Sequence, residues 1–158
     1  MRQVLLVGNG PSILDKPMGN AIDAFDGEVV RFNEFVLDPV EYTGTRTDTW
    51  VIAHKSHPVE HMHPELFSKI VKVPREIQYL NRATRLRSTG VAAMFWFLGM
   101  GYEVVLHGFN HFHPDKRLHY FDHDRGIELV KNVKTHPYDG ELVREAMAEG
   151  MPVRYFDE

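Results

Sequence analysis

Short apolar runs recur along the chain, separated by polar and glycine-containing segments, and each run has the length of a buried strand. The first covers residues 4–7, is made of valine and leucine, and ends at Gly8. A short run of this composition next to a turn residue is typical of a strand buried on both faces. Similar runs follow at residues 29–32, 49–53, 70–73, 104–107 and 152–155. The pattern predicts about six strands.

Helical patterns lie between these runs, most clearly at residues 88–100 and 139–149. In the second of these, apolar side chains at the spacing of one helix face are Leu142, Val143, Ala146 and Met147. Alternating strands and helices predict an α/β fold with a mostly parallel sheet covered by helices, a single Rossmann-like domain over residues 1–158. Ligands of such sheets bind beyond the carboxyl ends of the strands. Residues 110–125 have no clear element and are expected to form a lid.

Composition narrows the function classes. With 43% hydrophobic and 25% charged residues, the chain has the make-up of a globular domain. A formal net charge of -4 argues against a nucleic-acid partner, and a small ligand is expected instead. There is no cysteine, so no disulfide or thiolate metal site can form, and a cytoplasmic location is expected. The first apolar run is too short for a signal peptide or a membrane span.

The loop after the first strand has the composition of a ligand-binding turn. Gly8 and Gly10 allow the backbone to approach a ligand closely, and Asn9 and Ser12 add short polar side chains. The loop lacks the third glycine of a dinucleotide fingerprint and the Gly-Lys-Ser/Thr of a P-loop, so neither assignment applies. Taken alone, it fits a nucleotide site and an ordinary strand-to-helix turn equally well.

Two further positions carry polar groups to the same predicted edge of the sheet. Asn33 directly follows the second strand, where its amide can donate to and accept from a ligand, or serve as a turn asparagine. Ser88 or Thr89 is a good N-cap for the helix that begins near Gly90. The amino end of that helix, with Arg87 beside it, is also a candidate anion site.

Histidines and a tyrosine after the fifth strand are candidates for proton transfer. His136 can act as a base near neutral pH, and His119 and Tyr120 can donate hydrogen bonds to a leaving phosphate. The ten histidines also invite a metal-binding interpretation, but none has a recognised zinc spacing, and no metal is expected. The histidines weighed for that role are His54, His57, His61, His63, His111 and His113.

Taken in order, these segments resemble the four motifs of the animal-type sialyltransferases, glycosyltransferase family 29. The first motif corresponds to residues 4–9 through 30–33 and 44–48, and the second to residues 87–90 through 102–109. The third resembles residues 119–122, and the last resembles His136 with Glu141. The sequence Asn9-Gly10-Pro11-Ser12 is closer to the bacterial sialyltransferases of family 42. The resemblance implies a GT-A-like sialyltransferase variant of the α/β fold.

The resemblance also implies roles for individual residues. Asn9, Ser12 and Asn33 would contact the ribose and phosphate of a CMP-sugar donor, and Gly108 and Phe109 would contact the cytosine. The full set expected to bind the donor is Gly8, Asn9, Gly10, Ser12, Asn33, Arg87, Ser88, Thr89, Gly90, Gly108 and Phe109. His136 would be the general base of an inverting displacement onto a glycan acceptor, with His119 and Tyr120 stabilising the departing phosphate. No cofactor or metal is implied.

Some features depart from these families, and other functions stay open. The family 29 disulfide is impossible here, the segments between motifs are short, and Phe112 stands where family 42 enzymes tend to have a tyrosine. The donor sugar is expected to be sialic acid or the related acid Kdo. The alternatives are a CMP-binding module without transferase activity and a nucleotide enzyme resembling the pterin pyrophosphokinases or the flagellin glycosyltransferases.

Overall fold

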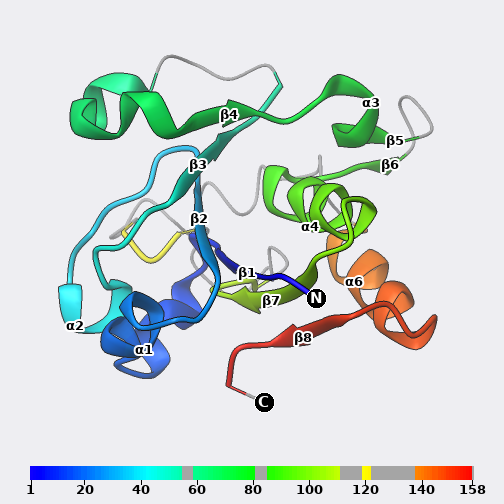
Figure 1. Cartoon of the computed structure of the whole chain (residues 1–158), viewed down its shortest axis with the longest axis horizontal. Coiled ribbons are helices and arrows are strands. Elements are labelled where there is room, and N and C mark those ends of the chain that lie inside the picture. Colours follow the sequence, from blue (N-terminus) through cyan, green and yellow to red (C-terminus); the bar gives the residue numbers. More distant parts are fainter. Residues whose placement is uncertain (55–58, 81–84, 111–118, 122–137, 158) are drawn as a thin grey trace.

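The structure is a computed structural model, and it describes residues 1–54, 59–80, 85–110, 119–121 and 138–157. Its centre is a six-stranded sheet in the order β4-β3-β2-β1-β7-β8, in which every neighbouring pair is parallel (Figure 1). The strands are β1 (Gln3–Val7), β2 (Glu28–Phe32), β3 (Thr49–Ile52), β4 (Ile70–Lys72), β7 (Glu103–His107) and β8 (Val153–Tyr155). Each predicted strand is confirmed to within one residue at either end.

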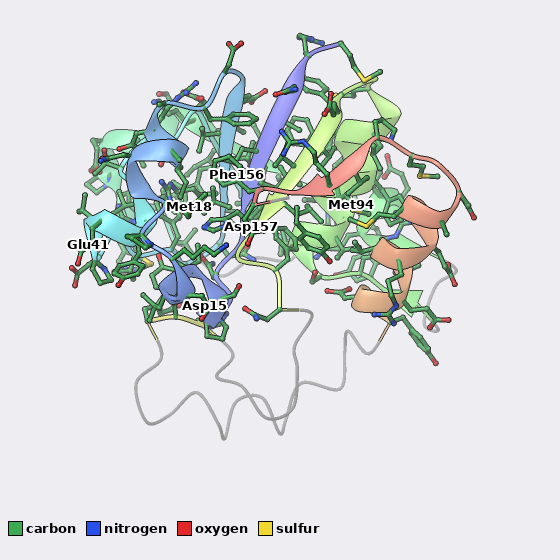
Figure 2. All side chains as sticks on the ribbon, turned by 90° about the horizontal axis from the view of Figure 1, so that it is seen from below. Asp15, Met18, Glu41, Met94, Phe156 and Asp157 are labelled. Atoms are coloured by element: carbon green, nitrogen blue, oxygen red, sulfur yellow. The ribbon has the colours of Figure 1, made fainter. Side chains whose placement is uncertain are left out.

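Helices cover both faces of this sheet. The two longest helices of the described residues, α4 (Thr89–Gly99) and α6 (Asp139–Ala148), lie on one face, and η1 (Pro11–Asp15) and α1 (Gly19–Asp23) lie on the other. Figure 2, a view from below, shows these two groups of helices on opposite sides of the sheet. Both predicted helices are confirmed, and the α/β fold with a mostly parallel sheet is as expected. None of the described helices has the length and apolar character needed to cross a bilayer.

Alternation along the strands gives each face its own core. On the α4 side, Val4 and Leu6 of β1 are fully buried against the helix residues Val91 and Met94. On the α1 side, Leu5 is fully buried with the neighbouring strands and with η1 and α1. Because both faces are covered, β1 reads as a continuous apolar run, which is why its pattern was so clear.

Short elements join these layers, and the apolar pattern did not predict them. A two-stranded antiparallel hairpin pairs β5 (Tyr79–Leu80) with β6 (Arg85–Leu86). Each strand is too short to show a period, so only the backbone pairing reveals it. The other short helices that the structure describes are α2 (Val40–Thr43), η2 (Glu60–Met62), η3 (Pro64–Lys69) and α3 (Arg75–Gln78). Of these, α3 packs on α4 beside the candidate site.

Arg31 of β2 is a buried charge that fixes a neighbouring loop. Its guanidinium group donates to the carbonyls of Thr43 (2.8 Å) and Arg46 (3.0 Å) and to the Thr47 hydroxyl (3.0 Å). Burial lowers the pKa of Arg31 to about 10, partly offset by the charge of Asp23. The arginine stays cationic at neutral pH and is matched with acceptors, as a buried charge requires.

Candidate functional site

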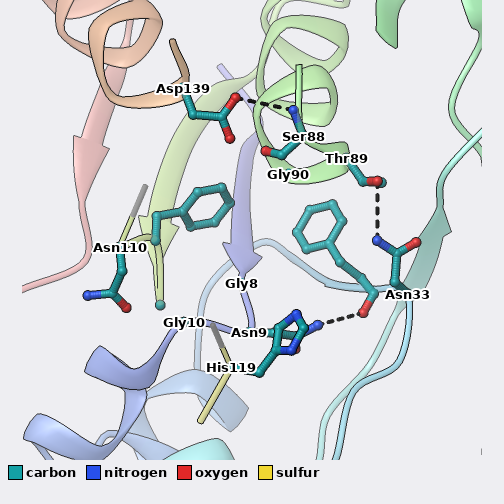
Figure 3. A pocket seen from close by; sticks show the side chains of 13 residues that line it. Gly8, Asn9, Gly10, Asn33, Ser88, Thr89, Gly90, Asn110, His119 and Asp139 are labelled. Atoms are coloured by element: carbon teal, nitrogen blue, oxygen red, sulfur yellow. Dashed lines mark hydrogen bonds between the residues drawn. The ribbon is translucent and has the colours of Figure 1, made fainter. Parts of the chain in front are cut away.

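A pocket opens at the carboxyl ends of β1, β2 and β7, where the amino end of α4 also points (Figure 3). This is the edge at which parallel α/β sheets bind their ligands. Nine of the residues expected to bind the donor line it, together with His119 from the predicted catalytic set. The nine are Gly8, Asn9, Gly10, Asn33, Ser88, Thr89, Gly90, Gly108 and Phe109, and the further lining residues are Phe32, Asn110 and Asp139.

One side of the pocket, here called the glycine wall, consists of Gly8, Gly10 and Gly108. The Gly8 and Gly10 amides donate to the carbonyls of His107 (2.7 Å) and Gly108 (2.8 Å), so the two strand ends lie edge to edge. A Cβ on Gly8 would lie 2.6 Å from the Gly108 carbonyl oxygen, and Gly108 has φ +74°. A side chain at Gly8 would collide with that oxygen, and glycine adopts the positive φ of Gly108 without strain. Main-chain atoms therefore form this wall.

The opposite side, here called the polar wall, consists of Asn33, Ser88, Thr89 and Asp139. Asn33 adopts a left-handed conformation with φ 46°. Its side-chain oxygen accepts from the Ala53 amide (2.9 Å), and its Nδ2 donates to the Thr89 hydroxyl (3.2 Å). The side chain that looked like a free ligand contact is thus held by protein on two sides.

Asn9 lies between the two walls and is also engaged with protein. Its Nδ2 donates to the carbonyls of Phe32 (3.0 Å) and Glu34 (3.1 Å), as Figure 3 shows for the first. Both amide hydrogens are used, which leaves the side-chain oxygen as the group that can accept from a ligand. Asn9 therefore joins the ends of β1 and β2 and offers an acceptor.

The amino end of α4 supplies hydrogen-bond donors. Ser88 is the N-cap: its side chain accepts from the Val91 amide (3.3 Å), and its carbonyl accepts from the Ala92 amide (2.9 Å). The first amides of a helix have no acceptor within the helix, so those of Thr89 and Gly90 can serve an anion, favoured by the helix dipole. A Cβ on Gly90 would come within 2.7 Å of the Phe109 ring, so glycine lets that ring close the pocket.

Asp139 is a pocket residue that the sequence analysis did not single out. It is 1% exposed at the start of α6, and its Oδ1 accepts from the Ser88 amide at 3.2 Å. Burial raises the pKa of Asp139 to about 6, against the opposing effects of hydrogen bonds from Ser88 and of the Arg87 charge. The only signal in the sequence was its place at the amino end of a predicted helix, which many surface aspartates share. It ties α6 to the amino end of α4.

Three of the predicted residues do not line the pocket. Ser12 faces a second cavity on the other side of Gly108, and its amide donates to Asn110 Oδ1 (3.0 Å). The Arg87 guanidinium lies over the Phe95 ring at 4.0 Å and donates to the Ile77 carbonyl (3.0 Å). Burial lowers the pKa of Arg87, partly offset by Asp139. Ser12 thus holds the pocket residue Asn110, whereas Arg87 packs against α3 and α4 outside the pocket lining.

Tyr120 is the third predicted residue that does not line the pocket. It is 5% exposed, and its hydroxyl donates to the Val36 carbonyl and accepts from the Val36 amide (3.1 Å). Burial raises the pKa of Tyr120, so the phenol is neutral. Its own amide donates to the Asn9 carbonyl at 2.9 Å. Tyr120 therefore anchors the segment that carries His119 to the loop after β1.

Only some of the histidines predicted to take part in chemistry or metal binding belong to the described residues. His119 lines the pocket beside Asn9 (Figure 3) and stacks on Phe121 at 4.9 Å. His136, the predicted general base, lies outside the described residues, as do Phe112, most of the predicted lid and the metal candidates His57, His111 and His113. His63 is packed against Phe35 at 4.2 Å. Among the residues that the structure describes, no three metal-binding side chains are grouped to hold an ion.

The fold and pocket place the chain in the class of α/β proteins that bind a ligand at the carboxyl edge of a parallel sheet. The sequence profile of glycosyltransferase family 29 (sialyltransferase) matches residues 45–145, which is more than half of the chain. The protein therefore belongs to glycosyltransferase family 29 and is a glycosyltransferase of the sialyltransferase type. No curated protein matches its sequence.

Solved sialyltransferases share the fold. A mammalian sialyltransferase in complex with Gal-beta-1-3GalNAc-ortho-nitrophenol superposes with a TM-score of 0.62 at 19% identity, covering 98% of this chain and 69% of that one. The sialyltransferase CstII from Campylobacter jejuni, in complex with cytidine-5'-monophosphate, gives a TM-score of 0.61 at 14% identity, covering 99% of this chain and 79% of that one. The similarity runs along nearly the whole chain, including the pocket edge.

Proposed function

We propose that this protein transfers sialic acid, or a related 2-keto sugar acid such as Kdo, from a CMP-linked donor to a hydroxyl group of a glycan. The observation that carries the proposal is the pocket that brings the glycine wall and the amino end of α4 together at one edge of the sheet. Its neutral donors and close backbone suit an anionic nucleotide-sugar. CstII, which has the same fold, has been solved with CMP and with CMP-3FNeuAc.

The pocket suggests how the donor is divided among the lining residues. The amides of Thr89 and Gly90 suit the sugar carboxylate or the phosphate, because both stand at the positive end of α4. Phe109, held edge to face against Phe32 at 6.2 Å, offers an aromatic surface for the cytosine beside Gly108. We assign the leaving phosphate to His119 and give Tyr120 the task of positioning it.

The reaction we propose is a single inverting displacement. An acceptor hydroxyl oxygen forms a bond to the anomeric carbon of the sugar while the bond from that carbon to the phosphate oxygen of CMP breaks. A ring nitrogen of His136 takes the proton of the hydroxyl, and the electron pair of the broken bond leaves on CMP. General-base catalysis of this kind contributes roughly 10²–10⁴-fold to the rate. We further propose that no metal takes part, so excess EDTA should leave turnover unchanged.

A panel of nucleotides tests the donor assignment. A ligand that binds only the folded state raises the melting temperature by mass action. CMP should stabilise the protein more than UMP, AMP or GMP do. Stabilisation by ATP with magnesium, and none by CMP, would replace this proposal with the kinase-like alternative. Binding of CMP without hydrolysis or transfer from any CMP-sugar would indicate a binding module.

Replacement of His136 tests the chemical step separately from binding. His136→Ala should lower turnover by roughly 10²–10⁴-fold and leave the affinity for CMP nearly unchanged, because the general base touches the acceptor. The control is His61→Ala, since His61 is exposed in η2 and lies outside the pocket. Equal turnover in the two variants would remove His136 from its role.

A further inference from the structure

Two side-chain amides converge on the hydroxyl group of Thr89, the first residue of α4. Thr89 Oγ1 accepts from Asn33 Nδ2 at 3.2 Å and from Gln78 Nε2 at 3.4 Å. Thr89 and Gln78 are 7% and 5% exposed. Thr89 lines the pocket and Gln78, at the end of α3, lies behind it. Figure 3 shows the bond between Asn33 and Thr89.

Main-chain amides fix which end of each side-chain amide faces Thr89. The Ala53 amide donates to Asn33 Oδ1 at 2.9 Å, and the His54 amide donates to Gln78 Oε1 at 2.7 Å. A main-chain N–H can only donate, so the atom facing it in each side chain must be the oxygen. The NH2 group of each side-chain amide therefore faces Thr89. If either amide flipped, its NH2 group would face a main-chain N–H, and two donors would meet without an acceptor.

This arrangement determines the direction of the threonine hydroxyl. A hydroxyl group has two lone pairs and one hydrogen, and here both lone pairs receive N–H groups. The hydrogen must therefore be donated, and within the described part of the chain no acceptor is placed for it. The neighbouring amides of Thr89 and Gly90 are also donors at this helix end. The Thr89 hydroxyl and these two amides are therefore three donors that a ligand can satisfy with acceptor oxygens.

We propose that Gln78 and Asn33 act as positioning residues that turn the Thr89 hydroxyl into an obligate donor to an anionic oxygen of the bound ligand. The identity of that ligand rests on the proposed function: a carboxylate of the donor sugar or the phosphate of CMP. A ligand that offers a hydrogen-bond donor at this point is rejected, because both lone pairs of the Thr89 hydroxyl oxygen already accept from Asn33 and Gln78. Gln78 thus contributes to specificity from behind the pocket.

The sharpest variant is Gln78→Glu. A carboxylate there still accepts from the His54 amide but faces Thr89 with an acceptor, which captures the hydroxyl hydrogen. Binding should weaken roughly 10-fold or more, the effect expected for losing a hydrogen bond to a charged group. Thr89→Val should weaken it by a similar factor, and the double variant no further. Thr89→Ser, which keeps the hydroxyl, is the matched control. Full affinity in Gln78→Glu, or additive losses in the double variant, would overturn the proposal.

Calorimetric titration with CMP and with CMP-sialic acid separates the two anionic sources. A loss seen with both ligands assigns the hydroxyl to the phosphate, and a loss confined to CMP-sialic acid assigns it to the sugar carboxylate. A loss of the same size for a neutral nucleoside, cytidine, would contradict the proposal, because cytidine has neither anionic group.

A second measurement needs no ligand and does not depend on the proposed function. Thr89→Val leaves the amides of both Asn33 and Gln78 without their acceptor, whereas in a Gln78→Met background it leaves only one. The drop in melting temperature caused by Thr89→Val should therefore be smaller in that background. Equal drops would overturn the hydrogen-bond arrangement itself. Unequal drops in a protein that binds neither ligand would support the arrangement and reject the proposed donor.

Discussion

The glycine wall and the polar wall of the pocket face the same space but are built from different parts of the chain. In the glycine wall, main-chain atoms of two strand ends approach so closely that side chains are excluded. In the polar wall, side chains from three separate segments are held by hydrogen bonds to one another and to main-chain amides. The first should therefore be sensitive to added atoms, and the second to any change of a donor into an acceptor.

The largest effect on stability should come from adding one methyl group to the glycine wall. In Gly108→Ala the new Cβ would lie 2.6 Å from the Gly8 carbonyl oxygen, at φ +74°. Left-handed strain and overpacking together should lower the free energy of unfolding by roughly 2–5 kcal/mol. Urea-induced unfolding followed by circular dichroism measures this loss.

Gly101→Ala is the matched control for that variant. Gly101 has φ +86°, but a Cβ there would have no neighbour within 4 Å. It should lose only the backbone strain of about 1–2 kcal/mol. The difference between the two variants isolates the cost of the close approach. Equal losses would mean that the glycine wall is not tightly packed.

The next effect concerns charge in the polar wall. Because burial raises the pKa of Asp139 to about 6 from 3.8, the folded protein holds a proton there that the unfolded chain has released. The free energy of unfolding should therefore fall as the pH rises from about 4 to about 6 and then level off. Roughly two pH units correspond to about 3 kcal/mol at most.

Asp139→Asn isolates this contribution, since asparagine keeps an oxygen for the Ser88 amide and has no proton to lose. The variant should gain stability relative to the original protein between pH 4 and pH 7. Parallel stability curves for the two proteins over that range, measured by urea unfolding, would show that the carboxyl titrates equally in both states.

The strands and the two long helices could be predicted because their signals are local. An apolar run such as residues 4–7, or the periodic residues 139–149, carries its own evidence of burial. Much of the pocket followed from topology, because the carboxyl ends of parallel strands meet at one edge, which gathers Gly8, Asn33 and Gly108. The helix-start pattern at residues 88–90 predicted the anion site at the amino end of α4, and the family resemblance gave these residues and His119 their roles toward a CMP-sugar donor.

Hydrogen bonds between residues far apart in the sequence could not be predicted. Tyr120 was predicted to stabilise the departing phosphate, but its hydroxyl is bound to the main chain of Val36. No local sequence pattern indicates that pairing. Gln78 and Asp139 carried no distinctive signal, and they become important only because α3 and α6 pack beside α4. The choice between ligand contact and protein contact for a polar side chain depends on partners far away in the sequence.

The smallest effect should come from Ser88, whose cap is one bond within the polar wall. Ser88→Ala removes the side-chain acceptor of the Val91 amide and should lower the free energy of unfolding by about 1 kcal/mol. It also removes a side-chain hydrogen bond that lowers the pKa of Asp139, so the fall in stability with rising pH should reach a higher pH. Ser88→Asp, which restores a capping oxygen, should recover the cap but place a second carboxyl beside Asp139. Unfolding of both variants at pH 5 and pH 8 separates these contributions. A Ser88→Asp protein that is as stable as the original at both pH values would show that the pKa of Asp139 does not depend on its neighbours in the polar wall.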